Sequence, residues 1–533
     1  MKRRDLLIKL KGKDETQSAS LNERTSSLTY SEALHLLRRV SFHPTPEQVL
    51  QIVGKTPVEA YELIVGTGSE QMPAPTQSMN SWLNVLEENP LENLPQDIKS
   101  EIEGRHRTHY FELINWWLDN MRSETFPSME KFTLFLHSIW SIEFTYDTLA
   151  LLPPPLLYRN NDTLRKNRLS DYNKIAEAVS QDGAMIMYQS LFYSGKSAPN
   201  ENYMRELMEL FTMGIGDLET GSTNYTEGDI REGARGLTGW RTVAYLGQNG
   251  APANRPFETF FVKAQHDTGG KKIMQFGQIA PITDDENTED LVRTKEVNGL
   301  IDILFSEKGL TISRFICEKI LRFFVYSDPG ADNMPIINEL AQFMQSNNYN
   351  LKKVYKKLFT SEYFFSDEVR GCQIKTPPEF IIGLERMFGV DFDSGQQGKT
   401  LTSVSELEQI LYDPPNVGSW KAYRTWLSTT TYPIRIKYSK EMLTRLSDTQ
   451  LINLVKKFPD YNSNFTNLLS NLTLYFLPVS LSQPRLDTLK QLLQNGMQES
   501  EWLSGISSNN ASVAQGIRQY LERIIVSPDF QLC

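Results

Sequence analysis

An arginine flanked by two glutamates stands at helical spacing in the middle of the chain. Glu201 and Glu209 lie four residues on either side of Arg205, and residues four apart share one face of an α-helix. A carboxylate there could perform acid/base chemistry while Arg205 holds an anionic or hydroxyl-rich ligand. The alternative is a structural ion-pair network that joins packed helices. The catalytic candidates on this helix are Glu206 and Glu209, and the ligand-binding candidates are Asn200, Glu201, Asn202 and Arg205.

A second group of polar residues lies in a glycine-rich turn that begins with His266 and Asp267 and ends at Lys271. The histidine could act as a base, the aspartate could orient it, and the lysine could serve as an electrophilic group. Neighbouring side chains on a strand point to opposite faces, which weakens a direct pair. The alternative is a turn that Asp267 stabilises, with His266 as a surface or packing residue.

The remaining histidines give weaker signals. His137 lies on an aromatic-rich segment, where a lone histidine is typical of a hydrogen-bonded core residue, and we keep it as a ligand-binding candidate. His106 and His109 could touch one ion if they are helical, but no third ligand is identifiable. The sequence has no G-x-S-x-G elbow and no H-E-x-x-H motif. We predict no metal site and no cofactor.

The composition excludes several classes of function. The 533 residues are 40% hydrophobic and 23% charged, which is ordinary for a globular protein. Asp and Glu number 65 against 55 for Lys and Arg, and the net charge of −10 favours neither nucleic acid nor a membrane surface as partner. No apolar run approaches the ~20 residues that cross a bilayer. Three distant cysteines cannot form a disulfide framework.

The elements that must position these residues are mainly helices. Threonines 29, 45 and 56 each precede a segment with helical start signals, and residues 201–213 form a further helix in this prediction. Residues 68–104 are expected to be an irregular connection, and the three prolines at 153–155 are expected to break the helical pattern. The predicted fold class is mainly α, a multi-helical globular domain with a small β-hairpin near residues 255–277.

The start of the chain is polar, and we expect residues 1–27 to form a mobile tail. Its pair Arg3-Arg4 is similar to the start of a twin-arginine export signal, but the apolar stretch that should follow ends at Leu10. The compartment therefore stays open between cytoplasm and periplasm.

Several motifs, in this order, carry a family resemblance. The longest is PNENYMRELMELFTMG at residues 199–214, and the chain resembles the domain-of-unknown-function 1800 family on it and on the following motifs. These are HLLRR at 35–39, YTEGDI at 225–230, ARGLTGW at 234–240, IKTPPE at 374–379, PPNVGSW at 414–420 and SPDF at 527–530. Trp240 closes one of them and is a further ligand-binding candidate. The resemblance implies one helical unit over residues 28–533.

What the resemblance implies about function is limited. Family members are often encoded beside a sulfatase-like partner family, which implies an envelope or export-linked role by association. Where the family tends to have a Trp-His-Asn-His-Phe run, this chain has Leu136-His137-Ser138-Ile139-Trp140, so the second histidine is missing.

Two hypotheses follow. The first is an enzyme, a hydrolase or lyase that acts on a glycan through a cleft of glutamate, arginine and histidine side chains. The second is a helical binding or accessory protein that presents these residues to a glycan or to a sulfatase-like partner. We favour the second, because the spacing alone completes no catalytic constellation.

Overall fold

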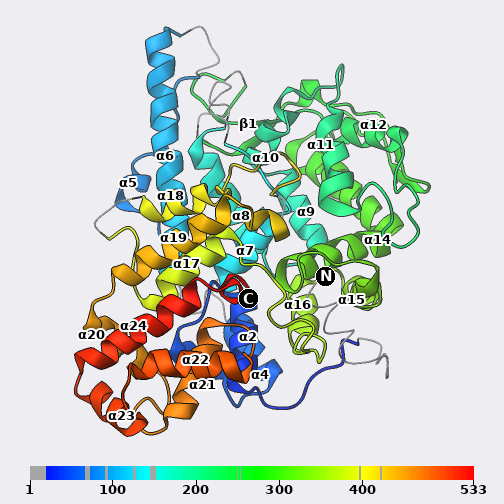
Figure 1. The fold of residues 1–533 in the computed structure, drawn as a ribbon. Coiled ribbons are helices and arrows are strands. Elements are labelled where there is room, and N and C mark those ends of the chain that lie inside the picture. Colours follow the sequence, from blue (N-terminus) through cyan, green and yellow to red (C-terminus); the bar gives the residue numbers. More distant parts are fainter. Residues whose placement is uncertain are drawn as a thin grey trace.

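Over its described residues, the computed structural model is mainly helical and carries two small antiparallel sheets (Figure 1). This confirms the predicted fold class. The described residues are 20–66, 72–89, 94–123, 128–144, 152–248, 250–252, 254–394, 398–420 and 423–533. Within them, no helix combines the length and the apolar character that a membrane crossing requires.

The first helices begin where their capping residues predict. Thr29, Thr45 and Thr56 each accept a hydrogen bond from the third residue of the helix, whose side chain bonds back to the threonine amide. This reciprocal pair satisfies two amides that the helix itself leaves unbonded. The helices are α2 (Tyr30–Val40), α3 (Pro46–Ile52) and α4 (Pro57–Tyr61).

The next segment corrects two predictions. Residues 68–104 are not irregular throughout, because α5 (Gln77–Asn80) lies within them and the long α6 (Gln96–Ser123) begins before residue 104. The prolines at 153–155 start a helix instead of breaking one, since α8 (Pro154–Asn167) has them at its first turn, where the missing N–H groups are not needed. Helix α7 (Ser128–His137) lies between α6 and α8 in the sequence.

The helix predicted over residues 201–213 has two parts. It starts as α11 (Glu201–Glu206) and continues as a π-helical turn, Leu207–Thr212. A π-helical turn takes one more residue than an α-helical turn, so Glu209 is rotated away from the position that regular spacing predicts. The helices around it are α9 (Tyr172–Ser180), α10 (Gly183–Tyr188) and α12 (Glu227–Gly236).

The β structure lies where it was predicted, but its strands pair differently. We expected residues 257–262 to pair with residues 272–274 across the turn at 266–270. Instead, β2 (Thr259–Phe261) pairs with β1 (Trp240–Thr242), and β3 (Lys271–Ile273) pairs with β4 (Gly277–Ile279). The local alternation indicates a strand but not its partner, which here lies outside the predicted hairpin on both sides.

Helices make up the rest of the described chain. They are α13 (Glu289–Val292), α14 (Gly299–Phe324), α15 (Met334–Ser346), α16 (Leu351–Phe359), α17 (Pro377–Phe388), α18 (Lys399–Glu406), α19 (Thr431–Thr444), α20 (Asp448–Lys456), α21 (Phe465–Phe476), α22 (Gln483–Gln494), α23 (Glu499–Ser507) and α24 (Ala511–Ile525). In α14 the backbone bends at Lys308, which has non-helical φ and ψ angles.

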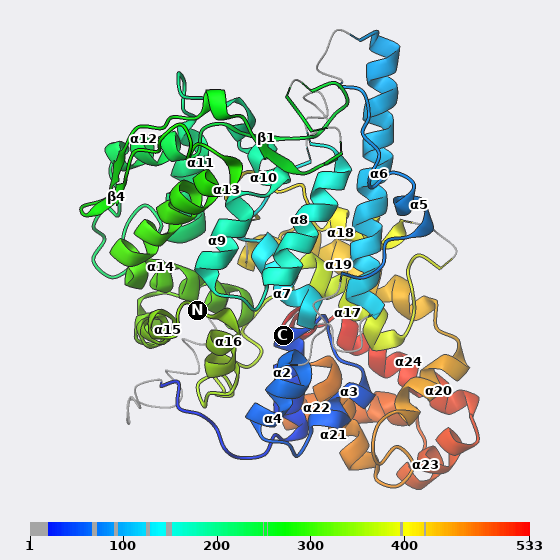
Figure 2. The same ribbon diagram turned by 180° about the vertical axis from the view of Figure 1, so that it is seen from behind.

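Segments far apart in the sequence lie side by side. Both views place α2 next to α21 and α22, at the end of the molecule opposite to α11 and α12 (Figures 1 and 2). The long helix α6 packs against α8, α17 and α18. Buried apolar side chains from Leu21 to Phe530 form one core cluster. The description of residues 28–533 as one domain remains a prediction.

Part of the predicted tail lies outside the described residues, and part lies inside. Residues 1–19, with the twin-arginine-like start, are outside. Leu21 is buried, and the Arg24 amide donates to the Thr360 carbonyl at 2.8 Å. Residues 20–24 therefore contact the end of α16.

Candidate functional site

The Arg205 side chain is held mainly by a residue that sequence spacing did not indicate. Its two terminal nitrogens donate to both oxygens of Glu227 at 2.9 and 2.8 Å, whereas Glu201 and Glu209 each lie 3.9 Å away. Glu227 stands in the first turn of α12, after the capping residue Thr226. The guanidinium therefore links α11 to α12. This contact supports the interpretation of the group as a structural ion-pair network.

The other α11 carboxylates have different surroundings. Glu209 accepts a hydrogen bond from the Tyr225 hydroxyl. Glu206 makes no hydrogen bond or ion pair within the described residues, and burial followed by the charge of Glu209 raises its pKa. Of the sequence candidates on this helix, Glu206 is the carboxyl group best prepared to hold a proton.

The asparagines at the start of α11 have structural surroundings. The Asn200 side chain accepts from the Asn202 amide at 2.8 Å and donates to the Gln189 carbonyl at 3.0 Å, which caps the helix and ties it to the end of α10. Asn202 is exposed. Neither residue needs a ligand to complete its contacts.

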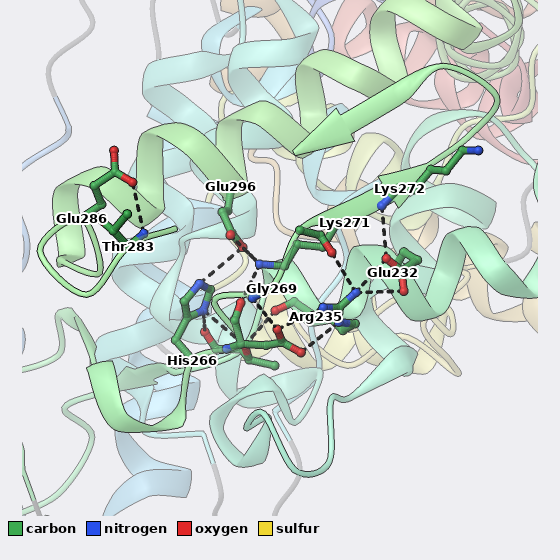
Figure 3. Close-up of polar contacts among 12 residues, drawn as sticks. Glu232, Arg235, His266, Gly269, Lys271, Lys272, Thr283, Glu286 and Glu296 are labelled. Atoms are coloured by element: carbon green, nitrogen blue, oxygen red, sulfur yellow. Dashed lines mark hydrogen bonds and ion pairs between the residues drawn. The ribbon is translucent and has the colours of Figure 1, made fainter. Parts of the chain in front are cut away.

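The turn at residues 266–271 is built around α12. Arg235, near the end of that helix, donates to both oxygens of Asp267 at 2.9 and 3.1 Å and also pairs with Glu232 (Figure 3). Burial opposes the ionisation of Asp267, but Arg235 and the Gly269 amide outweigh it and lower the pKa of the carboxyl. A Cβ atom at Gly269 would lie 2.6 Å from the guanidinium, so a larger residue there would displace the Arg235 side chain from its position.

His266 and Lys271 end in a buried ionic cluster with Glu296 (Figure 3). The Lys271 ammonium group donates to both Glu296 oxygens and to the Asp267 carbonyl, and burial lowers its pKa. The His266 ring nitrogen Nδ1 lies 3.0 Å from the Thr238 carbonyl, and Nε2 lies 3.4 Å from Glu296. The side chains of all three ionisable groups are fully buried, and of the three only His266 is among the residues that line the neighbouring hollow.

An open polar hollow of about 590 Å³ lies beside this turn, and we call it the turn hollow. Its lining includes Lys196, Lys263, Asp267 and Asn287. The Lys263 ammonium donates to the Asp284 carbonyl at 2.5 Å, and Asp267 is paired with Arg235. Two of its charged side chains, Lys263 and Asp267, are thus occupied by protein contacts.

The structure does not join the two predicted clusters in one pocket. Arg205 binds Glu227 at the start of α12, and Asp267 binds Arg235 near its end. Eight residues of helix separate these two anchors, a distance of roughly 12 Å along the axis. Arg205 is not among the residues that line the turn hollow.

Two other candidates lie in the core. Trp240 is 3% exposed, packs on Phe261 and has the Arg293 guanidinium 5.0 Å above its ring. His137 is fully buried, and its Nε2 accepts from the Tyr412 amide at 3.3 Å. Burial lowers the pKa of His137 to about 3, so its imidazole is neutral at ordinary pH. These contacts match the packing interpretation of His137, and both rings pack against other side chains of the protein.

His137 belongs to a set of contacts that ties the end of α7 to residues 411–420. The Ser141 hydroxyl donates to the Val417 carbonyl at 2.9 Å, and the Phe144 amide donates to the Tyr412 carbonyl at 2.7 Å. The last of these contacts places Glu143 beside Asp413. Burial, and then the charge of Asp413, raises the pKa of Glu143.

Glu143 and Asp413 line a second hollow of about 590 Å³, which we call the acidic hollow. Trp420, whose ring centroid lies 5.5 Å from that of His137, forms part of its wall. Trp426 is 4% exposed, and its indole N–H has no hydrogen-bond partner in the described structure. The lining of the acidic hollow includes Glu143, Glu408, Asp413, Asn416, Trp420 and Trp426.

Residues 35–532 match the family described as "Protein of unknown function (DUF1800)". The chain belongs to this family. No curated protein and no solved structure matches it. The DUF1800 match covers nearly the whole chain, as the motifs predicted, and it assigns no activity, glycan or partner.

Residues of the PPNVGSW motif line the acidic hollow, and the Trp420 of this motif packs against His137. Burial, followed by the charges of Glu143 and Glu206, raises the pKa of Tyr188. Sequence reasoning missed Glu143, Asp413 and Trp426. The sequence signal that could have found these residues is the PPNVGSW motif, which ends at Trp420 and directly follows Asp413.

The described part of this DUF1800 chain contains no group of three or more His, Cys, Asp or Glu side chains with the geometry of a metal site. Of the two histidines at helical spacing in α6, His109 stacks on Trp82 with ring centroids 4.6 Å apart. His106 is buried with Nε2 3.6 Å from Glu87. Both rings are engaged in packing.

Proposed function

We propose that this chain is a binding or accessory protein that holds a glycan in the acidic hollow. The observation that supports this most is the indole N–H of Trp426, which is buried on the hollow's wall without an acceptor. A buried donor without a partner costs free energy, and a ligand hydroxyl would supply the missing acceptor.

The remaining lining fits the same ligand. The negative face of the Trp420 ring attracts the slightly positive C–H groups of a sugar ring. Glu143, Glu408, Asp413 and Asn416 supply oxygens that accept hydrogen bonds from sugar hydroxyls. The volume of about 590 Å³ lies in the usual range for small-ligand sites.

The test compares two tryptophan variants in a binding experiment. Trp426→Phe keeps the ring and deletes the orphan N–H, and Trp240→Phe deletes another buried indole N–H that has no partner but lies beside the turn at residues 266–271. Thermal shift and calorimetry with neutral tetrasaccharides of glucose and of N-acetylglucosamine are expected to show binding to the native protein. Ligand at 100 times Kd stabilises a fold by about 2.7 kcal/mol.

We expect Trp426→Phe to lose the shift and Trp240→Phe to keep it. Loss in Trp240→Phe alone would contradict binding in the acidic hollow. No stabilisation by either sugar would overturn the glycan proposal.

The second candidate function is a hydrolase or lyase. The pKa values of Glu143 and Glu206 are both raised, and Glu143 stands beside the second carboxyl group of Asp413. Glycoside hydrolysis uses such a pair, in which one protonated carboxyl donates to the leaving oxygen and the other carboxylate takes a proton from water. Release of reducing ends by the native protein, lost in Glu143→Gln and Glu206→Gln, would favour this function. Equal turnover in both variants and the native protein would remove these residues from the mechanism.

A sulfatase-like partner, which the family resemblance implies, completes the accessory proposal. It predicts stable co-purification of the two proteins. If the two do not co-elute with or without the bound tetrasaccharide, the partner part of the proposal fails and the binding part stands.

A further inference from the structure

A larger hollow of about 1400 Å³ adjoins the acidic hollow, and we call it the long hollow. The two share Ser405 and Ile410 in their linings, so they lie next to each other. The long hollow runs along the packed pair α6 and α18. Its lining includes Phe111, Glu112, Asn115, Asp119 and Glu406. Two adjoining hollows suit an elongated ligand.

The long hollow carries the same mixture of apolar rings and unpaired polar atoms as the acidic hollow. Phe111 is 37% exposed and lines the long hollow. The Asn115 side-chain carbonyl is buried and accepts no hydrogen bond in the described structure. Thus the Trp426 N–H in the acidic hollow lacks an acceptor, and the Asn115 side-chain carbonyl in the long hollow lacks a donor. A hydroxyl-bearing chain supplies both, because each hydroxyl is donor and acceptor.

The charge along both hollows has one sign. Glu112, Asp119 and Glu406 line the long hollow, as Glu143, Glu408 and Asp413 line the acidic one. No lysine or arginine is among the described residues that line either. Neighbouring cations reduce part of this charge, since Arg122 contacts Asp119 and Lys437 lies 3.4 Å from Glu406. The carboxylates still repel anions and attract cations over about 8 Å at physiological salt.

We infer that the two hollows form one groove for an extended glycan that is uncharged or carries amines, and that this groove excludes sulfated and carboxylated glycans. The inference rests on the proposed function and adds the substrate class and the second half of the binding site. Trp420 and Trp426 hold one end of the chain, and Phe111 and Asn115 hold the other. The carboxylates accept hydrogen bonds from hydroxyl or ammonium groups and disfavour sulfate groups.

The experiment measures binding of four probes to the full chain by calorimetry. They are dimers and hexamers of N-acetylglucosamine, a glucosamine hexamer and a sulfated hexasaccharide. We expect the hexamer of N-acetylglucosamine to bind at least roughly tenfold more tightly than its dimer, because only the hexamer fills both hollows. The glucosamine hexamer should bind more weakly as salt rises, and the sulfated probe should not bind.

Two variants locate the second half of the groove. Phe111→Ala should weaken hexamer binding by roughly tenfold and leave dimer binding unchanged. Asp119→Asn, at a side chain that is 55% exposed, carries little risk to folding and should reduce the affinity for the glucosamine hexamer only. Phe276→Ala is the matched control, since Phe276 is 70% exposed and lines neither hollow, and it should bind every probe like the native protein.

The outcomes separate this inference from the proposed function. If dimer and hexamer bind equally well, or if the sulfated probe binds as well as the neutral one, the extended neutral groove is overturned while the acidic hollow keeps its ligand. If no probe binds, both proposals fail.

Discussion

The imidazole of His137 packs against the indole of Trp420 with ring centroids 5.5 Å apart, although the two residues are 283 positions apart in the sequence. The same imidazole accepts the Tyr412 amide hydrogen. A buried neutral histidine thus fixes both the backbone and one wall of the acidic hollow.

His137 makes the stability depend on pH. Its pKa is lowered by burial from 6.5 to about 3, so the folded state holds the neutral ring. This contribution is present above pH 6.5 and is lost as the pH falls toward 3, at up to about 1.4 kcal/mol per pH unit. In His137→Phe, which keeps an aromatic ring, this component should vanish. Urea unfolding of both proteins between pH 4 and 8 measures it, and parallel pH profiles would contradict the assignment.

Removal of one partner of the Lys271–Glu296 ion pair should strongly destabilise the fold, whereas replacement of both partners by apolar residues should destabilise it much less. Lys271→Met leaves a buried carboxylate without its cation, and we expect a loss of about 3–5 kcal/mol in unfolding free energy. The double variant Lys271→Met with Glu296→Leu removes both charges and should recover most of that loss. Chemical denaturation of the single and double variants decides the matter. A double variant as unstable as the single one would show that the charges are not the cause.

The ion pair between Arg205 and Glu227 should contribute little to stability. The Glu227 side chain is 65% exposed and that of Arg205 is 33% exposed, and exposed pairs contribute about 0–1 kcal/mol. We expect Arg205→Ala to lower the unfolding free energy by no more than about 1 kcal/mol, with a similar result for Glu227→Gln. A loss as large as that of Lys271→Met would mean that Arg205 does more than join two helices.

Gly239 and Gly247 provide a matched pair for backbone strain and crowding. Both have positive φ, +88° and +71°. A Cβ at Gly239 would lie 3.0 Å from the Phe261 ring and 3.3 Å from the His266 Cβ, whereas Gly247 has open space within 4 Å. Gly247→Ala should therefore cost about 1 kcal/mol from φ alone, and Gly239→Ala should cost more. Equal melting temperatures would refute the crowding at the motif of residues 234–240.

The sequence predicted most reliably what local chemistry controls. The capping threonines at 29, 45 and 56 mark helix starts because each reciprocal hydrogen-bond pair forms within four residues. The start of α6 was missed because residues 96–104 are polar and show little periodicity, although most of them favour helix. The strand at 259–261 was found and its partner was not, because the pairing with β1 crosses 16 intervening residues, 242 to 259.

The site was harder to predict than the fold. Glu201, Arg205 and Glu209 attract attention at regular spacing, yet the π-helical turn and Glu227 change their partners. Glu143 gives no signal of its own, since it follows α7 as a single acid and gains its neighbour only through the Phe144–Tyr412 hydrogen bond. Charges that meet through tertiary contacts are invisible to spacing within one helix.

The bond between the Tyr412 amide and His137 spans 275 residues of chain. Closing a loop of this length costs conformational entropy before any contact is gained. The walls of the acidic hollow come from segments far apart in the chain, so neither half of the polypeptide expressed alone contains both of them. Mixing the two halves in trans would restore the hollow only if they associate.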